Sequence, residues 1–177
     1  LLFSVLIIFT ACESIPKPQN SRVGVLMGYM ETYIDQEFGL VRKGSYMNNV
    51  MLRLENVDTK EAKFAFTQNG FFTYHNLMPG VYKIVNWKYY FSGAGESYTW
   101  FHVYFDKPIV VEIKPGTVTM ISKFKSVAEL TREKNWNYPF YQLPTTKAEM
   151  EKEFSEDPKN KFWQDFQKEF VVLSDKK

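Results

Sequence analysis

Apolar and polar residues alternate along the chain from Arg22 to about Val127. In one such run the aliphatic residues Val50, Leu52 and Leu54 occupy every second position. A period of two places successive side chains on opposite faces of a β-strand, whereas helical side chains repeat every ~3.6 residues. The pattern therefore predicts a series of short β-strands, each with one buried face.

Short turn signals separate the alternating runs. Asn69-Gly70 lies between two of them, and Pro79-Gly80 and Pro115-Gly116 follow further along the chain. Asn and Gly tolerate a positive φ and Pro fixes φ, so these pairs favour tight turns, and Asn-Gly in particular favours a hairpin. We therefore expect a mainly β fold, an antiparallel sandwich or barrel of roughly seven to eight strands.

After Val127 the pattern changes to that of helices. The segment 146–149 (Thr-Lys-Ala-Glu) has the spacing of a capping box that opens a short helix. Asp157-Pro158 suits the N-cap and first position of a second helix. Apolar residues spaced by four then predict a buried stripe on that helix: Phe162, Phe166 and Phe170, with Trp163 beside them. We expect these C-terminal α-helices to pack on the sandwich.

The run from Gly70 to Ile84 reads Gly-Phe-Phe-Thr-Tyr-His-Asn-Leu-Met-Pro-Gly-Val-Tyr-Lys-Ile. It resembles the pattern G-x-F-x-F-x-N-L-x-P-G-x-Y-x-L of the transthyretin-like β-sandwiches. These include carboxypeptidase regulatory-like domains and the Cna protein B-type repeats of bacterial surface proteins. The resemblance implies a β-sandwich over about residues 22–127, and the change of pattern after Val127 predicts an aromatic and helical extension over 128–177. The resemblance implies no chemistry, since the matching residues pack or turn.

Composition and charge narrow the class of protein. The chain has 177 residues, 22 basic and 20 acidic side chains and a net charge of +2. The two signs are mixed along its length, which argues against nucleic-acid binding because phosphate binders cluster Lys and Arg. Hydrophobic residues make up 45% and aromatic residues 18%, enough for a sizeable core.

The first residues resemble a lipoprotein signal. Residues 1–10 are apolar and uncharged, but a membrane-spanning helix needs ~20 such residues. The length suits the apolar region of a signal peptide. Phe9-Thr10-Ala11-Cys12 then resembles a bacterial lipobox, with Phe9 where Leu is usual. The alternative is a buried N-terminal strand with an inert cysteine.

Cys12 is the one cysteine of the chain, and lipidation would explain both its presence and its position. The resemblance implies removal of residues 1–11 and a lipid anchor on Cys12. Residues 13–21 contain two prolines and few apolar side chains, so we expect an extended tether that holds the domain ~25–30 Å from the bilayer. The expected location is the cell envelope. The acidic Glu13 favours the outer membrane over the inner one.

The sequence offers little for catalysis. His75 and His102 lie in no ligand-spaced motif, and we expect His75 to face solvent from a hairpin. There is no G-x-S-x-G motif and no phosphate-binding glycine motif. We therefore expect no enzyme activity, no metal site and no cofactor.

The residues most suggestive of binding lie between Tyr98 and Phe105. Phe101, Val103 and Phe105 share one face of the predicted strand and fit a core. The other face carries side chains with apolar bodies and polar tips: Tyr98, Trp100, His102 and Tyr104. If this face is exposed, its aromatic rings would suit stacking on a sugar or contact with a protein partner. The interpretation that we favour, however, is that the helix from about Pro158 covers this face, because the apolar stripe of that helix must be buried against something.

Together these features predict a membrane-anchored lipoprotein whose sandwich is a non-catalytic binding or structural module of the cell envelope. A second hypothesis is a carbohydrate- or peptidoglycan-binding accessory lipoprotein, associated with a hydrolase, that uses the aromatic face. The expected partners of the chain are the membrane, through Cys12, and an envelope protein or a glycan.

Overall fold

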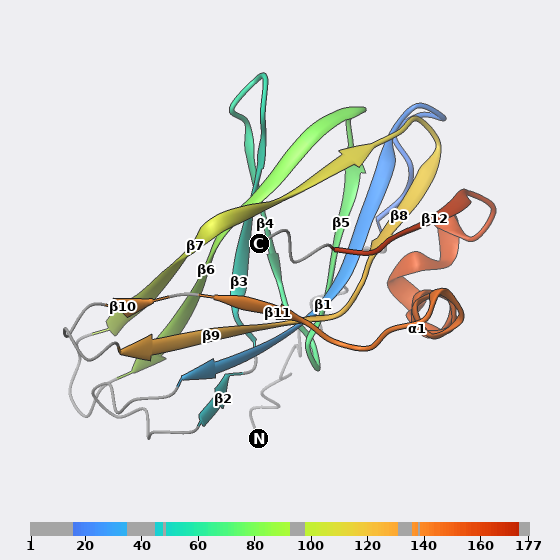
Figure 1. Cartoon of the computed structure of the whole chain (residues 1–177). Helices are drawn as coiled ribbons and strands as arrows, with labels where there is room; N and C mark the ends of the chain where they lie inside the picture. The colour runs from blue at the N-terminus through green and yellow to red at the C-terminus, as the bar shows by residue number, and fades with distance from the viewer. Residues whose placement is uncertain are drawn as a thin grey trace, which may run out of the picture.

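The computed structural model describes residues 16–34, 45–47, 49–92, 98–130, 136–137 and 139–173. Strands make up most of it (Figure 1). They are β1 (Gly24–Ile34), β2 (Ser45–Met47), β3 (Met51–Asn56), β4 (Ala62–Phe66), β5 (Phe71–Leu77), β6 (Gly80–Ser92), β7 (Tyr98–Ile113), β8 (Thr117–Ile121), β9 (Phe124–Leu130), β10 (Trp136–Asn137), β11 (Phe140–Gln142) and β12 (Gln167–Val171). The helical segments are the α-helix α1 (Lys147–Glu156) and the 3-10 helix η1 (Pro158–Trp163).

The strands form two sheets, and the predicted β-sandwich is confirmed. One sheet has the order β4-β3-β6-β7. The other has the order β10-β9-β1-β8-β12, with β2 and β5 also paired to β1 and β11 paired to β9. The smaller sheet is antiparallel throughout, but β1 pairs in parallel with β8 and β9, and β8 pairs in parallel with β12. Each parallel pair joins strands far apart in the sequence, which local turn signals cannot predict.

The turn at Asn69-Gly70 forms as predicted, with φ of 50° and 86° at its two residues. Its hairpin is very short, however, because only Gln68 and Phe71 bridge across it. Beyond that bridge the two strands separate, since β4 pairs with β3 and β5 pairs with β1. The turn therefore carries the chain from one sheet to the other.

The core lies between the sheets. Along β3 the side chains alternate between half-buried and buried, as predicted, with Leu52 and Leu54 at the buried positions. Polar atoms inside the core are bonded across the sheets: the Trp87 indole Nε1 donates to the Ser126 hydroxyl at 2.8 Å. The Tyr74 hydroxyl donates to the Leu52 carbonyl at 2.9 Å, and burial raises the pKa of this tyrosine above its usual range.

The C-terminal segment differs from the prediction after α1. The capping box is present, because the Thr146 hydroxyl accepts from the Glu149 amide and the Glu149 carboxylate accepts from the Thr146 amide. The second α-helix is absent from this region: η1 ends at Trp163, and Gln167–Val171 is a strand parallel to β8. The predicted aromatic set nevertheless packs on the sandwich for the most part: Trp163 is fully buried, and Phe166 and Phe170 are partly buried against the same cluster. Phe162 is the exception, at 40% exposed.

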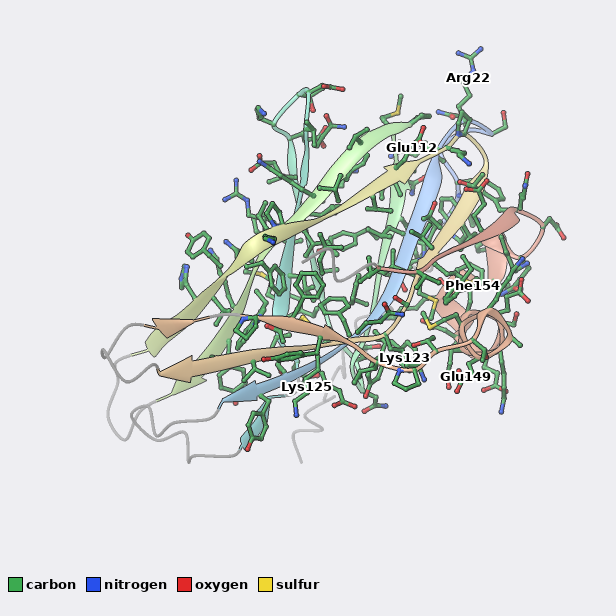
Figure 2. The ribbon with its side chains drawn as sticks, viewed as in Figure 1. Arg22, Glu112, Lys123, Lys125, Glu149 and Phe154 are labelled. Atoms are coloured by element: carbon green, nitrogen blue, oxygen red, sulfur yellow. The ribbon has the colours of Figure 1, made fainter. Side chains whose placement is uncertain are left out.

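The segment also covers a different sheet from the one expected. Trp163, Phe154 and Met150 pack with apolar side chains of β1 and β8, and Phe154 lies between α1 and that sheet (Figure 2). In Figure 1 this region is on the far side of the sandwich from β7. The expectation that it covers the aromatic face of β7 is therefore wrong.

Part of the predicted tether belongs to the folded body. The Asn76 amide group accepts from the Gln19 N–H at 2.8 Å and donates to the Lys17 carbonyl at 3.0 Å. The Trp163 indole donates to the Pro16 carbonyl at 2.9 Å. Residues 1–15, with Cys12, lie outside the described residues. Within the described ranges, no helix is both long enough and apolar enough to cross a membrane.

Candidate functional site

The aromatic face predicted on β7 lies at one edge of the four-stranded sheet. His102 is exposed and Tyr104 is 56% exposed, while Val103 and Phe105, which alternate with them, are buried. This alternation is the one predicted. The side chains of Tyr98 and Trp100 lie outside the described residues, but their backbone continues β7 opposite β6. The structure therefore places His102 and Tyr104 together on an open surface.

Charged side chains occupy the centre of the same sheet face. Glu55 in β3 accepts from Arg53 at 3.0 Å and from Lys83 in β6 at 2.9 Å. The hydrogen bond from Lys83 is the main reason that the pKa of Glu55 lies below its usual value. These pairs hold the outward side chains of β3 and β6 in place between the two edges of the sheet.

Asn86 in β6 is a buried polar residue next to the aromatic face. The register of β6 shifts between Ile84 and Asn86 against both neighbouring strands, so Asn86 lies at an irregularity of the sheet. Its register partners are Arg53 in β3 and Tyr104 in β7. Asn86 is fully buried, and neither atom of its amide has a hydrogen-bond partner among the described residues. Leaving such a group unpaired costs about 1–3 kcal/mol, so its presence calls for a reason.

A cleft of about 920 Å³ lies at the opposite edge of this sheet. Phe64 and Phe66 of β4 form one side, and Phe71, Phe72 and Thr73 of β5 also line it. The carboxylates of Glu153, Glu156 and Asp157, from the end of α1, complete it. The volume is within the range typical of ligand sites, ~300–1,000 Å³.

Sequence reasoning missed this cleft. In β4, Phe64 and Phe66 alternate with Ala65 and Thr67, as the sequence indicates. The buried face is that of Ala65 and Thr67, however, whereas Phe64 and Phe66 are 52% and 59% exposed. Alternation shows which residues share a face but not which face meets the core. No local signal identified the cleft, because its sides come from two different sheets.

His75 lines the cleft, and the prediction that it faces solvent is wrong. It is half-buried, and its Nε2 is 2.9 Å from the Asn160 carboxamide oxygen. Since the Asn160 nitrogen donates to the Phe154 carbonyl, its oxygen is the acceptor, and neutral His75 carries its proton on Nε2. Burial lowers the pKa of His75, while Asn160 and then Asp157 oppose that shift.

The groups at the two edges of the sheet can bind a ligand. Among the described residues, no group of three or more His, Cys, Asp and Glu side chains is placed to hold a metal ion. What the two edges of the four-stranded sheet offer is exposed aromatic rings beside amide, guanidinium and carboxylate groups. Such combinations recognise ligands by stacking and hydrogen bonding.

Comparison with known proteins adds little to this picture. A scan against models of protein families finds no match, and a search of curated proteins finds no similar chain. Among solved structures, a proposed carbohydrate-binding protein from Pseudomonas aeruginosa is similar at 11% identity. The match covers 88% of this chain and 90% of that one, with a TM-score of 0.31. Likeness at this level supports no conclusion about the ligand of the present chain.

Proposed function

We propose that the chain is a non-catalytic binding module of the bacterial cell envelope, held at a membrane through a lipid on Cys12. The observation that carries the binding role is the open surface on β7, where Tyr104 is 56% exposed beside the exposed His102. The C-terminal segment packs on the other sheet and leaves this surface uncovered. A tyrosine and a histidine exposed side by side each offer an apolar ring for stacking and a polar tip for hydrogen bonding.

The anchoring rests on the sequence. Phe9-Thr10-Ala11-Cys12 resembles a lipobox, and the acidic Glu13 after it favours the outer membrane. The β-sandwich agrees with the transthyretin-like resemblance of the run from Gly70 to Ile84, a family that includes modules of bacterial surface proteins. That family membership remains a prediction.

Mass spectrometry of the N-terminal peptide from the membrane fraction tests the anchor. We expect residues 1–11 to be absent and Cys12 to carry a diacylglyceryl group. The Cys12→Ala variant should be unprocessed and carry no lipid. An intact apolar N-terminus in the wild type, or a Cys12→Ala protein that is still processed and membrane-bound, would show the proposal to be wrong.

A second candidate function is the binding of carbohydrate or peptidoglycan on the same surface. The Asn86 amide favours it, because its polar atoms have no hydrogen-bond partner within the described part of the chain and its register partners are Tyr104 and Arg53. Planar amide and guanidinium groups hydrogen-bond to sugar hydroxyls, and aromatic rings stack on the apolar faces of sugars. A hydroxyl reaches Asn86 only if a neighbouring side chain turns aside, since the residue is fully buried.

Peptidoglycan pull-down and glycan-array binding test this candidate. We expect Trp100→Ala and Tyr104→Ala to lose binding. Val110→Ala is the matched control, because Val110 is 57% exposed on the same strand but carries no ring. Equal binding by all three variants would remove β7 as the glycan surface.

A further inference from the structure

We propose that the cleft between β4, β5 and the end of α1 binds an extended peptide segment that carries Lys or Arg side chains. The peptide backbone pairs with the open edge of β4 as an additional strand. This site lies across the sheet from the aromatic face of β7, so it is a second binding surface, beyond the proposed function.

The first support is the open edge of β4. Within the described residues β4 pairs only with β3, so its other edge faces the cleft. The Thr67 amide donates to Val50 and the Asn56 amide donates to Glu61, both at 2.9 Å. Bonding alternates along an antiparallel pair, so these two bonds direct the N–H and C=O groups of Phe64 and Phe66 away from β3. Open edges of this kind accept added strands.

The second support is that β5 also presents its free edge to the cleft. The Met30 amide of β1 donates to the Gly70 carbonyl at 2.8 Å, which fixes the alternation along β5. By that alternation the backbone N–H and C=O groups of Phe72 and Tyr74 bond to β1, and those of Thr73 point away from β1. Thr73 lines the cleft. A strand within the cleft therefore meets unpaired backbone groups on the side of β4 and a polar edge on the side of β5.

The third support is the charge of the lining. Glu153, Glu156 and Asp157 line the cleft, against one cationic side chain from Lys159. The Glu156 carboxylate also lies 3.9 Å from the Lys152 ammonium, and the Asp157 carboxylate accepts from the Lys159 amide. With both lysines counted, the lining is still net acidic. His75 does not offset these carboxylates near neutral pH, because burial lowers its pKa below its usual value. The charge thus favours a cationic ligand and disfavours an acidic one.

Two exposed rings complete the site. Phe64 and Phe66 are more than half exposed and lie on the outward side of β4. Side chains of a neighbouring strand stand beside such rings, at cross-strand spacing. An aliphatic side chain gains apolar contact there, and a Lys or Arg gains cation–π attraction. A neutral glycan could use the rings and carboxylates but not the ladder of backbone groups, so the observations favour a peptide.

The test measures fluorescence anisotropy of labelled pentapeptides with the full chain kept in detergent. The probe alternates Val and Lys. One comparison peptide alternates Val and Glu, and another repeats the Val-Lys sequence with N-methyl groups on alternate amides, which blocks strand pairing. We expect only the unmodified Val-Lys peptide to bind, and its affinity to fall with added salt.

Variants locate the site. Glu153→Gln with Glu156→Gln should weaken binding about tenfold, because each removes a charge that faces the ligand. Glu151→Gln is the control, since Glu151 is on the same helix and, like Glu156, pairs with a lysine, but it does not line the cleft. Phe66→Pro removes an outward N–H, whereas Phe66→Ala removes only the ring, so the proline variant should bind more weakly than the alanine variant. Melting curves establish that each variant is folded.

Tyr104→Ala separates this proposal from the proposed function. It should leave peptide binding unchanged, because Tyr104 is on the opposite edge strand of the sheet. The proposal is overturned if the Val-Lys peptide does not bind, if the N-methylated or acidic peptide binds equally well, or if Tyr104→Ala abolishes binding. It is also overturned if a chitin-derived oligosaccharide binds in the cleft and the peptide does not.

Discussion

Trp163 joins three parts of the chain that are distant in sequence. Its indole nitrogen donates to Pro16, and its ring lies 5.4 Å from that of His75 and 5.1 Å from that of Phe166, centroid to centroid. It is fully buried, although its neighbour Phe162 is 40% exposed. The adjacent pair therefore offers a controlled comparison of buried and exposed aromatic residues.

Trp163→Ala should destabilise the fold by about 3–5 kcal/mol, since it leaves a large cavity under η1. Phe162→Ala should cost less than about 1 kcal/mol, because the ring is partly in solvent. Urea denaturation followed by circular dichroism measures both. If Phe162→Ala is as destabilising as Trp163→Ala, the packing of this segment differs from that described above.

His75 should make stability depend on pH. Its pKa in the folded state lies below the ordinary histidine value of about 6.5, so the unfolded chain binds the proton first as pH falls. The contribution of His75 is therefore fully present above about pH 6.5 and is lost as pH falls toward the folded-state pKa. One proton changes the free energy of unfolding by at most about 1.4 kcal/mol per pH unit.

His75→Gln keeps a donor for Asn160 and removes the titration. Denaturation midpoints between pH 5 and pH 7 should consequently change less in this variant than in the wild type. His102→Gln is a comparison variant, because burial and then Lys88 also lower the pKa of His102. Comparing the two profiles separates the contribution of the half-buried His75 from that of the exposed His102. Parallel profiles for wild type and His75→Gln would contradict the assigned role of burial.

At the scale of elements, the strands and turns that rest on local signals were predictable, and the pairings between distant segments were not. Asn69-Gly70 and the capping box at Thr146 act within a few residues, and both form. Gln167–Val171 is a strand because the edge of β8 is available to it. The spacing of Phe166 and Phe170 by four residues is compatible with a helix and does not reveal that edge.

The two candidate sites show the same difference between local signals, which the sequence reveals, and long-range pairing, which it does not. The alternation of His102 and Tyr104 against Val103 and Phe105 is a local property of β7, and it was predicted. The cleft requires β4 and β5 to belong to different sheets, and that depends on β1 and β3 as partners. Long-range pairing of this kind is not encoded in the period of a single strand.

Truncation after Glu156 tests the contribution of η1 and β12. It exposes Val118 and Met120 together with Phe154, and it opens the edge of β8. We expect the melting temperature to fall by several degrees or the protein to aggregate. An unchanged melting curve, with rapid proteolysis of the segment in the full-length chain, would show that the segment is not part of the stable fold.

At the scale of the whole molecule, the two candidate binding surfaces and the C-terminal segment lie on different parts of the sandwich. The aromatic surface is at the β7 edge of one sheet, the cleft is at the β4 edge, and the C-terminal segment covers the other sheet (Figure 1). Residues 16–19 run beside the cleft, where Pro16 contributes to its lining. Asn76 fixes this stretch through its side chain.

Asn76→Gly tests that attachment. Asn76 has a φ of 55°, a conformation that glycine adopts easily, so the change removes two hydrogen bonds with little backbone strain. Hydrogen exchange at the Gln19 amide should become about tenfold faster. The Leu173 amide, which bonds to Ser122, should be unaffected. No change at Gln19 would mean that other contacts hold the segment.

The attachment at Pro16 has a geometric consequence for a lipid-anchored protein. If the anchor is on Cys12, four residue steps separate it from Pro16, where the described part of the chain begins, and they can span at most ~14 Å. That is about half of the reach expected from a tether extending to residue 21. A linker this short limits how far the domain can tilt and keeps its Pro16 end near the lipid headgroups. The mouth of the cleft would then open close to the bilayer, where the sequences within reach are those that emerge directly from the membrane.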